Sequence, residues 1–168
     1  VPTISYEYGQ QLEFKGEYAL ALKMYGSACT EIQTTLTELE LGVDNGSSSN
    51  KSLGGGSSKL ADLMMQQYGS KSSYDYEDAV SELKNKLKQC TAGLTRMTIR
   101  QGDLRRGILM ANESNDKALC RECGSVLESM KQYGDAARMY EKGGSLEKAA
   151  SIYIQTKDFD SAKPLMSM

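Results

Sequence analysis

Residues 133–166 read YGDAARMYEKGGSLEKAASIYIQTKDFDSAKPLM, and this stretch decides the fold because its pattern repeats every thirteen residues. In each unit a large apolar residue is followed three positions later by alanine, and four positions after that by a second large residue. The units are Tyr133, Ala136 and Tyr140; Leu146, Ala149 and Tyr153; and Phe159, Ala162 and Met166. Offsets of three and four share one helix face, and alanine lets a neighbouring helix approach closely. The stretch therefore predicts helices of about ten residues, joined by short turns with Gly, Ser and Asp as stops and caps and packed as antiparallel hairpins.

The same pattern appears at the start of the chain in a fuller form. The residues that carry it are Gly9, Leu12, Gly16, Tyr18, Ala21, Tyr25 and Ala28, and matching offsets recur at Cys120, Cys123, Gly124, Leu127, Tyr133, Ala136, Tyr140 and Gly143. A weaker copy lies around residues 102–107. This spacing of small and aromatic residues is typical of a tetratricopeptide-like (TPR-like) helix–turn–helix. We define as repeat-packing residues, which should fill helix–helix junctions, Gly9, Gly16, Tyr18, Ala21, Tyr25, Ala28, Gly124, Tyr133, Ala136, Tyr140, Ala149, Tyr153, Phe159 and Ala162.

One segment interrupts the helical pattern. Eleven of the seventeen residues 42–58 are Gly or Ser, a composition that buries too little apolar surface to offset the entropy of ordering. We expect a first helical hairpin over 1–41, a flexible insertion over 42–75 with a short helix at 59–68, and further hairpins over 76–168. The predicted fold class is all-α: a TPR-like α-α hairpin solenoid fragment with a disordered Gly/Ser insertion.

Composition excludes several classes of function. The chain has 168 residues, no histidine and a net charge of −2, so the commonest general base is absent and a nucleic-acid binder is disfavoured. No paired-carboxylate or phosphate-loop motif appears, no apolar run is long enough to span a membrane, and no signal segment opens the chain. We expect a soluble, intracellular, non-enzymatic protein without cofactor or small-molecule substrate. The chain begins with Val and its apolar pattern runs to the last residue, so we also expect a fragment of a longer protein.

Two groups of residues are candidate binding sites. Cys120 and Cys123 form a C-x-x-C that is open to a zinc or redox interpretation, but a structural zinc site takes about four ligands. Cys29 and Cys90 are isolated in the sequence, so we interpret Cys120 and Cys123 as small core residues and expect no metal. The densest basic cluster is a possible partner-binding site for an acidic surface, and it consists of Arg96, Arg100, Arg105 and Arg106.

Four longer stretches together resemble one protein family. They are residues 97–107 (MTIRQGDLRRG), 123–133 (CGSVLESMKQY), 136–143 (AARMYEKG) and 147–153 (EKAASIY). These residues closely resemble the WD-repeat protein 19 family, the large WD-repeat and TPR-like subunit of intraflagellar transport complex A. Residues 5–8, 11–14 and 16–25 fit the region just upstream. The resemblance covers roughly 1–30 and 85–160, whereas the Gly/Ser insertion and residues 59–76 depart from the family pattern.

The resemblance implies a function as well as a fold. It implies a segment of the α-solenoid of a ciliary transport scaffold that holds other complex A subunits and takes part in retrograde transport and in import of membrane proteins into the cilium. The implied location is the cilium or flagellum, the basal body and the cytoplasm, and the implied partners are other complex A subunits. A TPR peptide-binding receptor or a vesicle-coat solenoid subunit remains the alternative.

Overall fold

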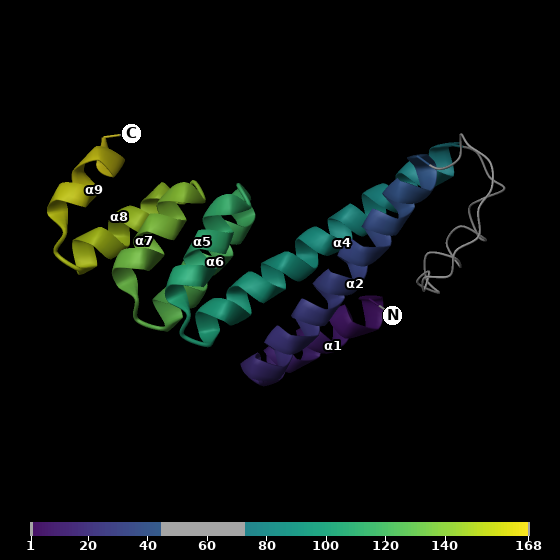
Figure 1. Ribbon diagram of the computed structural model, residues 1–168. Helices are drawn as coiled ribbons and strands as arrows, with labels where there is room; N and C mark the ends of the chain where they lie inside the picture. The colour runs from purple at the N-terminus through teal and green to yellow at the C-terminus, as the bar shows by residue number, and fades with distance from the viewer. Residues whose placement is uncertain (1, 45–72, 168) are drawn as a thin grey trace.

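A computed structural model describes residues 2–44 and 73–167 of the chain. Within these two ranges the chain forms eight helices and no strand (Figure 1). The helices are α1 (Pro2–Lys15), α2 (Tyr18–Asp44), α4 (Ser73–Arg100), α5 (Leu104–Glu113), α6 (Lys117–Ser129), α7 (Tyr133–Lys142), α8 (Leu146–Gln155) and α9 (Phe159–Met166). The predicted all-α class is confirmed for these residues.

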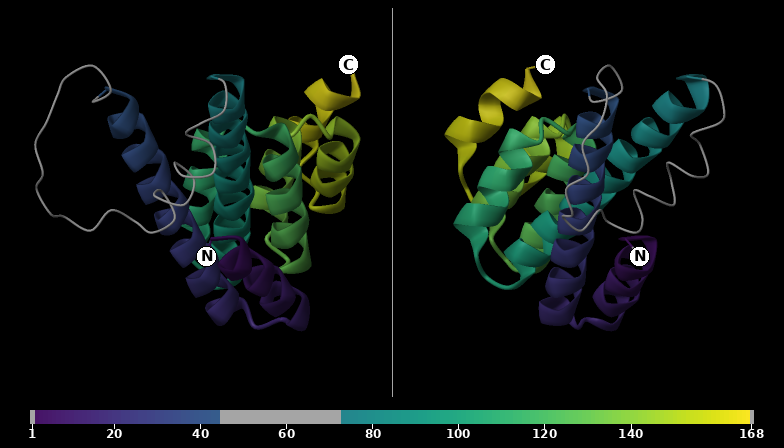
Figure 2. Two further views of the ribbon diagram at one scale, coloured as in Figure 1. Left: turned by 90° about the vertical axis from the view of Figure 1, so that its right-hand side faces the viewer. Right: turned by 45° about the vertical axis from the view of Figure 1, so that its right-hand side comes forward.

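The helices stand side by side in one row of antiparallel hairpins (Figures 1 and 2). Helix α4 connects the two parts of the row, because α2 packs along one side of it and α5 and α6 pack against its C-terminal half. Helices α2 and α4 have 27 and 28 residues, while the helices from α5 to α9 have 8 to 13. The pair α2–α4 therefore extends well beyond the short helix α1 (Figure 1).

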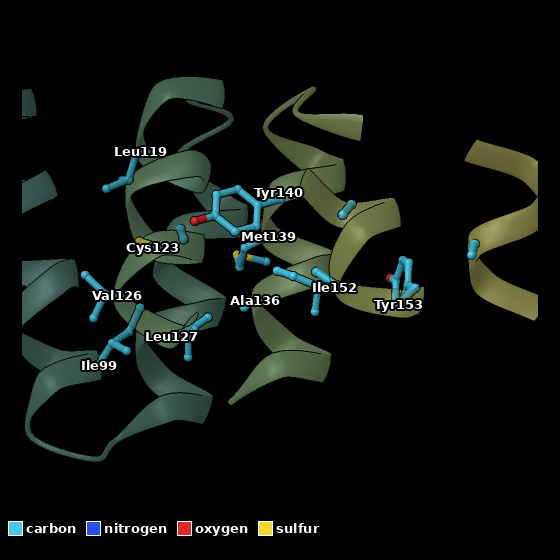
Figure 3. Packing of buried hydrophobic residues seen from close by; sticks show 14 residues of the cluster. Ile99, Leu119, Cys123, Val126, Leu127, Ala136, Met139, Tyr140, Ile152 and Tyr153 are labelled. Atoms are coloured by element: carbon cyan, nitrogen blue, oxygen red, sulfur yellow. The ribbon is translucent and has the colours of Figure 1, made fainter. Parts of the chain in front are cut away.

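Buried side chains form one large cluster and two smaller ones. The large cluster runs from the end of α4 to α9, with Tyr140 between α6 and α7 (Figure 3). The two smaller clusters lie among α1, α2 and α4, where Tyr25 and Ile32 are fully buried. Each helix thus buries one face against its neighbours in the row, as expected for stacked hairpins.

Five of the six described turns between consecutive helices have the same backbone geometry. Five helices end at a residue with positive φ, and the next backbone N–H then bonds to a carbonyl five residues earlier. This geometry is the Schellman motif, which satisfies carbonyls that the helix end leaves without partners. The left-handed residues of these five turns are Gly16, Gly102, Lys131, Gly144 and Lys157. Three aspartates also cap helices, since side chains of Asp103, Asp116 and Asp158 accept backbone N–H bonds.

The thirteen-residue pattern matches the observed helices closely. Helices α7, α8 and α9 begin at Tyr133, Leu146 and Phe159, the first residues of the three predicted units. Ser145 occupies the N-cap position of α8, but its side chain makes no capping hydrogen bond. Helix α2 continues to Asp44 and α4 starts at Ser73, so helix occupies both ends of the predicted insertion. Residues 45–72, which include the predicted helix at 59–68, lie outside the described residues.

Candidate interaction site

Three repeat tyrosines each donate a hydrogen bond to a glutamate twelve residues earlier, on the preceding helix. We call these pairs the Tyr–Glu clamps. The O···O distances are 2.6 Å for Tyr25–Glu13, 2.8 Å for Tyr140–Glu128 and 3.3 Å for Tyr153–Glu141. Each clamp joins the helix that carries the tyrosine to the preceding helix. The hydrogen bond between hydroxyl and carboxylate therefore fixes the register between the two helices.

The clamp tyrosines stay protonated over the ordinary pH range. Burial, followed by the hydrogen bond to Glu128, raises the pKa of Tyr140 to about 12. Burial and the bond to Glu13 likewise raise the pKa of Tyr25 above its usual value. Because a protonated phenol is a donor, each clamp remains a charge-assisted hydrogen bond at neutral pH.

Small residues make room for the clamp rings. A Cβ atom on Gly9 would lie 3.1 Å from the Tyr25 ring, and one on Gly93 of α4 would lie 2.6 Å from it. Gly124 gives Tyr140 the same space, since a Cβ there would lie 3.0 Å from the ring. Tyr25 is therefore enclosed by α1 and α4: a Cβ atom at Gly93 would clash with its ring, and one at Gly9 would require the ring to shift by a few tenths of an ångström.

The other repeat-packing residues differ in burial. The alanines at positions 21, 28, 136, 149 and 162 are buried, as are Tyr25, Tyr140 and Tyr153. Tyr18 and Tyr133 are only half-buried, and Gly16 is an exposed turn residue. Phe159 differs most from expectation, with 55% of its surface exposed. It is the first residue of α9, which packs mainly against α8.

Arg96 lies in an internal network rather than in an exposed basic patch. Its Nε and Nη2 donate to the two carboxylate oxygens of Glu13 at 2.9 and 3.1 Å, and its Nη1 donates to Glu122 at 2.7 Å. Glu13 also accepts the hydrogen bond from Tyr25, so the network links α2, α1, α4 and α6. The Arg96 side chain is only 21% exposed. Arg96 therefore fastens the first hairpin to the remainder of the row.

The Glu13 carboxylate is stabilised by these donors. Burial alone would raise its pKa, but the hydrogen bonds from Arg96 and Tyr25 outweigh burial and hold the pKa of Glu13 below its usual value. The pKa of Arg96 is raised despite its burial, because the charged guanidinium faces Glu13 and Glu122. Both groups are thus ionised at neutral pH.

The remaining three arginines lie at the α4–α5 end of the row. The Arg100 guanidinium lies 5.1 Å from the centre of the Tyr18 ring and donates to the Ser129 hydroxyl at 3.0 Å. Arg105 and Arg106 are exposed in the first turn of α5. The structure therefore separates the predicted cluster into two engaged arginines, Arg96 and Arg100, and two that face solvent.

The cysteines fall into two groups. Cys120 and Cys123 are buried on α6, and burial raises the pKa of both thiols. Cys29 and Cys90 lie in one cluster between α2 and α4, a proximity that the sequence analysis did not anticipate. Across the described residues no three His, Cys, Asp or Glu side chains are grouped to hold a metal ion. Nor is any helix there both long and apolar enough to cross a membrane.

Known proteins similar to this chain are WD-repeat proteins. The chain is 32% identical over 166 residues to WD repeat-containing protein 19 of Homo sapiens, and 31% identical over 166 residues to that of Mus musculus. It is 28% identical over 155 residues to WD repeat-containing protein dyf-2 of Caenorhabditis elegans. The alignments include 92–99% of this chain but only 8–9% of those proteins. No family model matches the chain. The predicted resemblance is confirmed, as a likeness to one short segment of these proteins.

Proposed function

We propose that the chain is a solenoid segment of a ciliary transport scaffold of the WD-repeat protein 19 type, and that it acts by holding protein partners rather than by catalysis. The observation that carries the proposal is the likeness to WD repeat-containing protein 19 along 99% of the chain. The row of clamped hairpins supports it, because stacked hairpins present an extended surface on a continuous core. Under this proposal the partners are other subunits of intraflagellar transport complex A, in the cilium, the basal body and the cytoplasm.

Arg105 and Arg106 are the proposed partner-binding residues. Both are exposed at the start of α5, next to a turn that is held by the Asp103 cap, whose carboxylate accepts the backbone N–H of Arg106 at 3.2 Å. Guanidinium groups on a well-held helix end suit recognition of carboxylates on an acidic partner, since they bind two oxygens at once. Retrograde transport and import of membrane proteins are the processes in which this segment would act.

Affinity purification tests the proposal. The chain is used as bait in lysate of ciliated cells, and co-purified proteins are identified by mass spectrometry. We expect complex A subunits in amounts well above those recovered with an unrelated TPR protein. Recovery of proteins that share a short C-terminal motif, without complex A subunits, would contradict the scaffold and favour a TPR peptide receptor.

A further inference from the structure

Two free thiols lie in the interface between α2 and α4, the two longest of the described helices. Cys29 of α2 and Cys90 of α4 belong to the same buried cluster, and both are free. Their exposed fractions are 7% and 0%. The Cys29 sulfur lies 3.8 Å from the hydroxyl of Thr91, the residue next to Cys90 in α4, and each thiol is the largest influence on the pKa of the other. The packing of α2 on α4 thus places the two thiols in one buried cluster.

The two thiols of the pair are chemically unequal. The neighbouring Cys90 thiol, helped by the Thr91 hydroxyl, outweighs burial and lowers the pKa of Cys29. The pKa of Cys90 is raised, by its interaction with the Cys29 thiol and by burial. Cys123 is a useful contrast, because burial raises its pKa to about 12. Cys29, the less buried member of the pair, is therefore the thiol that ionises more readily, and thiolate is the reactive form.

We propose that Cys29 and Cys90 are a redox-active pair that hydrogen peroxide converts into a disulfide between α2 and α4. The Cys29 thiolate attacks one peroxide oxygen, the O–O bond breaks, and the released hydroxide takes a proton to form water. The product on Cys29 is a sulfenic acid. The Cys90 sulfur then attacks the Cys29 sulfur, the S–O bond breaks, and the leaving hydroxide takes the Cys90 proton as a second water. Two thiols are oxidised and one peroxide is reduced to two waters.

The disulfide would covalently join α2 to α4, the helix that connects the two parts of the row. Cys29 and Cys90 are far apart in the sequence, so the bond closes a long loop and restricts the unfolded chain strongly. Oxidation should therefore raise the unfolding temperature and hold α2 against α4. A dithiol reductant should reverse both effects, because thiol–disulfide exchange restores the two thiols.

Peptide mapping tests the pair directly, because trypsin places each cysteine in a separate peptide. Cys29 falls in residues 24–51, Cys90 in 89–96, Cys120 in 118–121 and Cys123 in 122–131. The protein is treated with hydrogen peroxide near neutral pH, its remaining thiols are alkylated, and the unreduced digest is examined by mass spectrometry. We expect peptide 24–51 joined to 89–96, with a rate that rises with pH as more of the Cys29 thiol is ionised. Dithiothreitol should separate the two peptides.

Variants separate the roles of the two thiols. In Cys90→Ser, which keeps a donor beside Cys29 but removes the second sulfur, the reaction should stop at a sulfenic acid on Cys29, which dimedone traps. The double variant Cys120→Ala, Cys123→Ala is the matched control and should form the cross-link at the parent rate. A bridge between peptides 118–121 and 122–131, or four unmodified thiols in the peroxide-treated parent protein, would overturn the proposal. Peptide mapping of the parent protein shows which cysteines are cross-linked even if a variant does not fold.

Discussion

The Tyr140 hydroxyl on α7 donates a 2.8 Å hydrogen bond to the Glu128 carboxylate on α6. The Lys148 ammonium of α8 lies 5.2 Å from the centre of the same ring, so one tyrosine links three consecutive helices. Tyr25 has the corresponding bond to Glu13 in the first hairpin. Because the pair recurs with the same twelve-residue separation, the same register is set in hairpins far apart in the chain.

Replacement of Tyr140 by Phe tests whether the clamp contributes to stability. The ring and its packing remain, while the hydrogen bond to a charged group is lost, so we expect a loss of about 1–3 kcal/mol in the free energy of unfolding. Urea denaturation measures it. Tyr8→Phe is the control, since Tyr8 is 49% exposed and should change by less than about 0.5 kcal/mol. Equal urea midpoints for Tyr140→Phe and Tyr8→Phe would contradict a stabilising role for the clamp.

A pair of glycine substitutions tests the enclosure of the Tyr25 ring. Gly93→Ala places a Cβ atom 2.6 Å from that ring, and overpacking of this kind costs roughly 1–3 kcal/mol. Gly134→Ala in α7 meets nothing within 4 Å and should stabilise the helix by roughly 0.5–1 kcal/mol. Thermal unfolding should shift in opposite directions for the two variants. A raised melting temperature for Gly93→Ala would show that α4 does not press on Tyr25.

Lys157 is a position where the backbone favours glycine over the residue present. Its φ is 64°, in the left-handed region that a side chain disfavours. Lys157→Gly relieves this strain but loosens the unfolded chain, so we expect a net gain of about 0.5–1 kcal/mol. Lys23→Gly, inside α2, should instead cost about 1 kcal/mol. If chemical denaturation shows the same loss for both variants, the turn does not have the left-handed geometry described here.

Acid should weaken the Arg96 network. The pKa of Glu13 is lower in the folded chain than its usual 4.5, so its contribution to stability is present above that value and is lost as pH falls through the folded pKa. Glu13→Gln should therefore be less stable than the parent protein at pH 7, with a difference that narrows as pH falls from about 5 to about 3. Urea titrations across this range measure the difference, and Glu17→Gln in the exposed turn is the control. A difference that is constant with pH would contradict the network.

Local periodicity predicted the C-terminal half well. Offsets of three, four and thirteen residues are enough to place α7, α8 and α9, because each helix packs on its immediate neighbour in the sequence. The same reasoning predicted burial of Phe159, which is largely exposed. An apolar helix position indicates which face packs, but whether a neighbour covers that face depends on the rest of the assembly.

Contacts between distant residues could not be predicted in this way. Arg96 is 83 residues from Glu13, and nothing local in the sequence distinguishes it from the exposed Arg105. Cys29 and Cys90 are likewise far apart in the sequence, and only the packing of α2 on α4 places them in one cluster. The Tyr–Glu clamps could be predicted only in part. The twelve-residue separation is visible in the sequence, but the hydrogen bond follows only when the two helices are known to pack antiparallel.

Charge reversal at the exposed arginines tests the scaffold proposal most directly. The whole protein carrying Arg105→Glu and Arg106→Glu is expressed in ciliated cells beside the parent protein, and co-purified complex A subunits are quantified by mass spectrometry. The control carries Lys23→Glu and Lys157→Glu, which change net charge equally on other exposed surfaces. Because charged side chains at an interface govern encounter and specificity, we expect recovery of at least one subunit to fall about tenfold for the arginine variant alone. Equal recovery with the parent, the arginine variant and the control would contradict the claim that this segment binds its partners through Arg105 and Arg106.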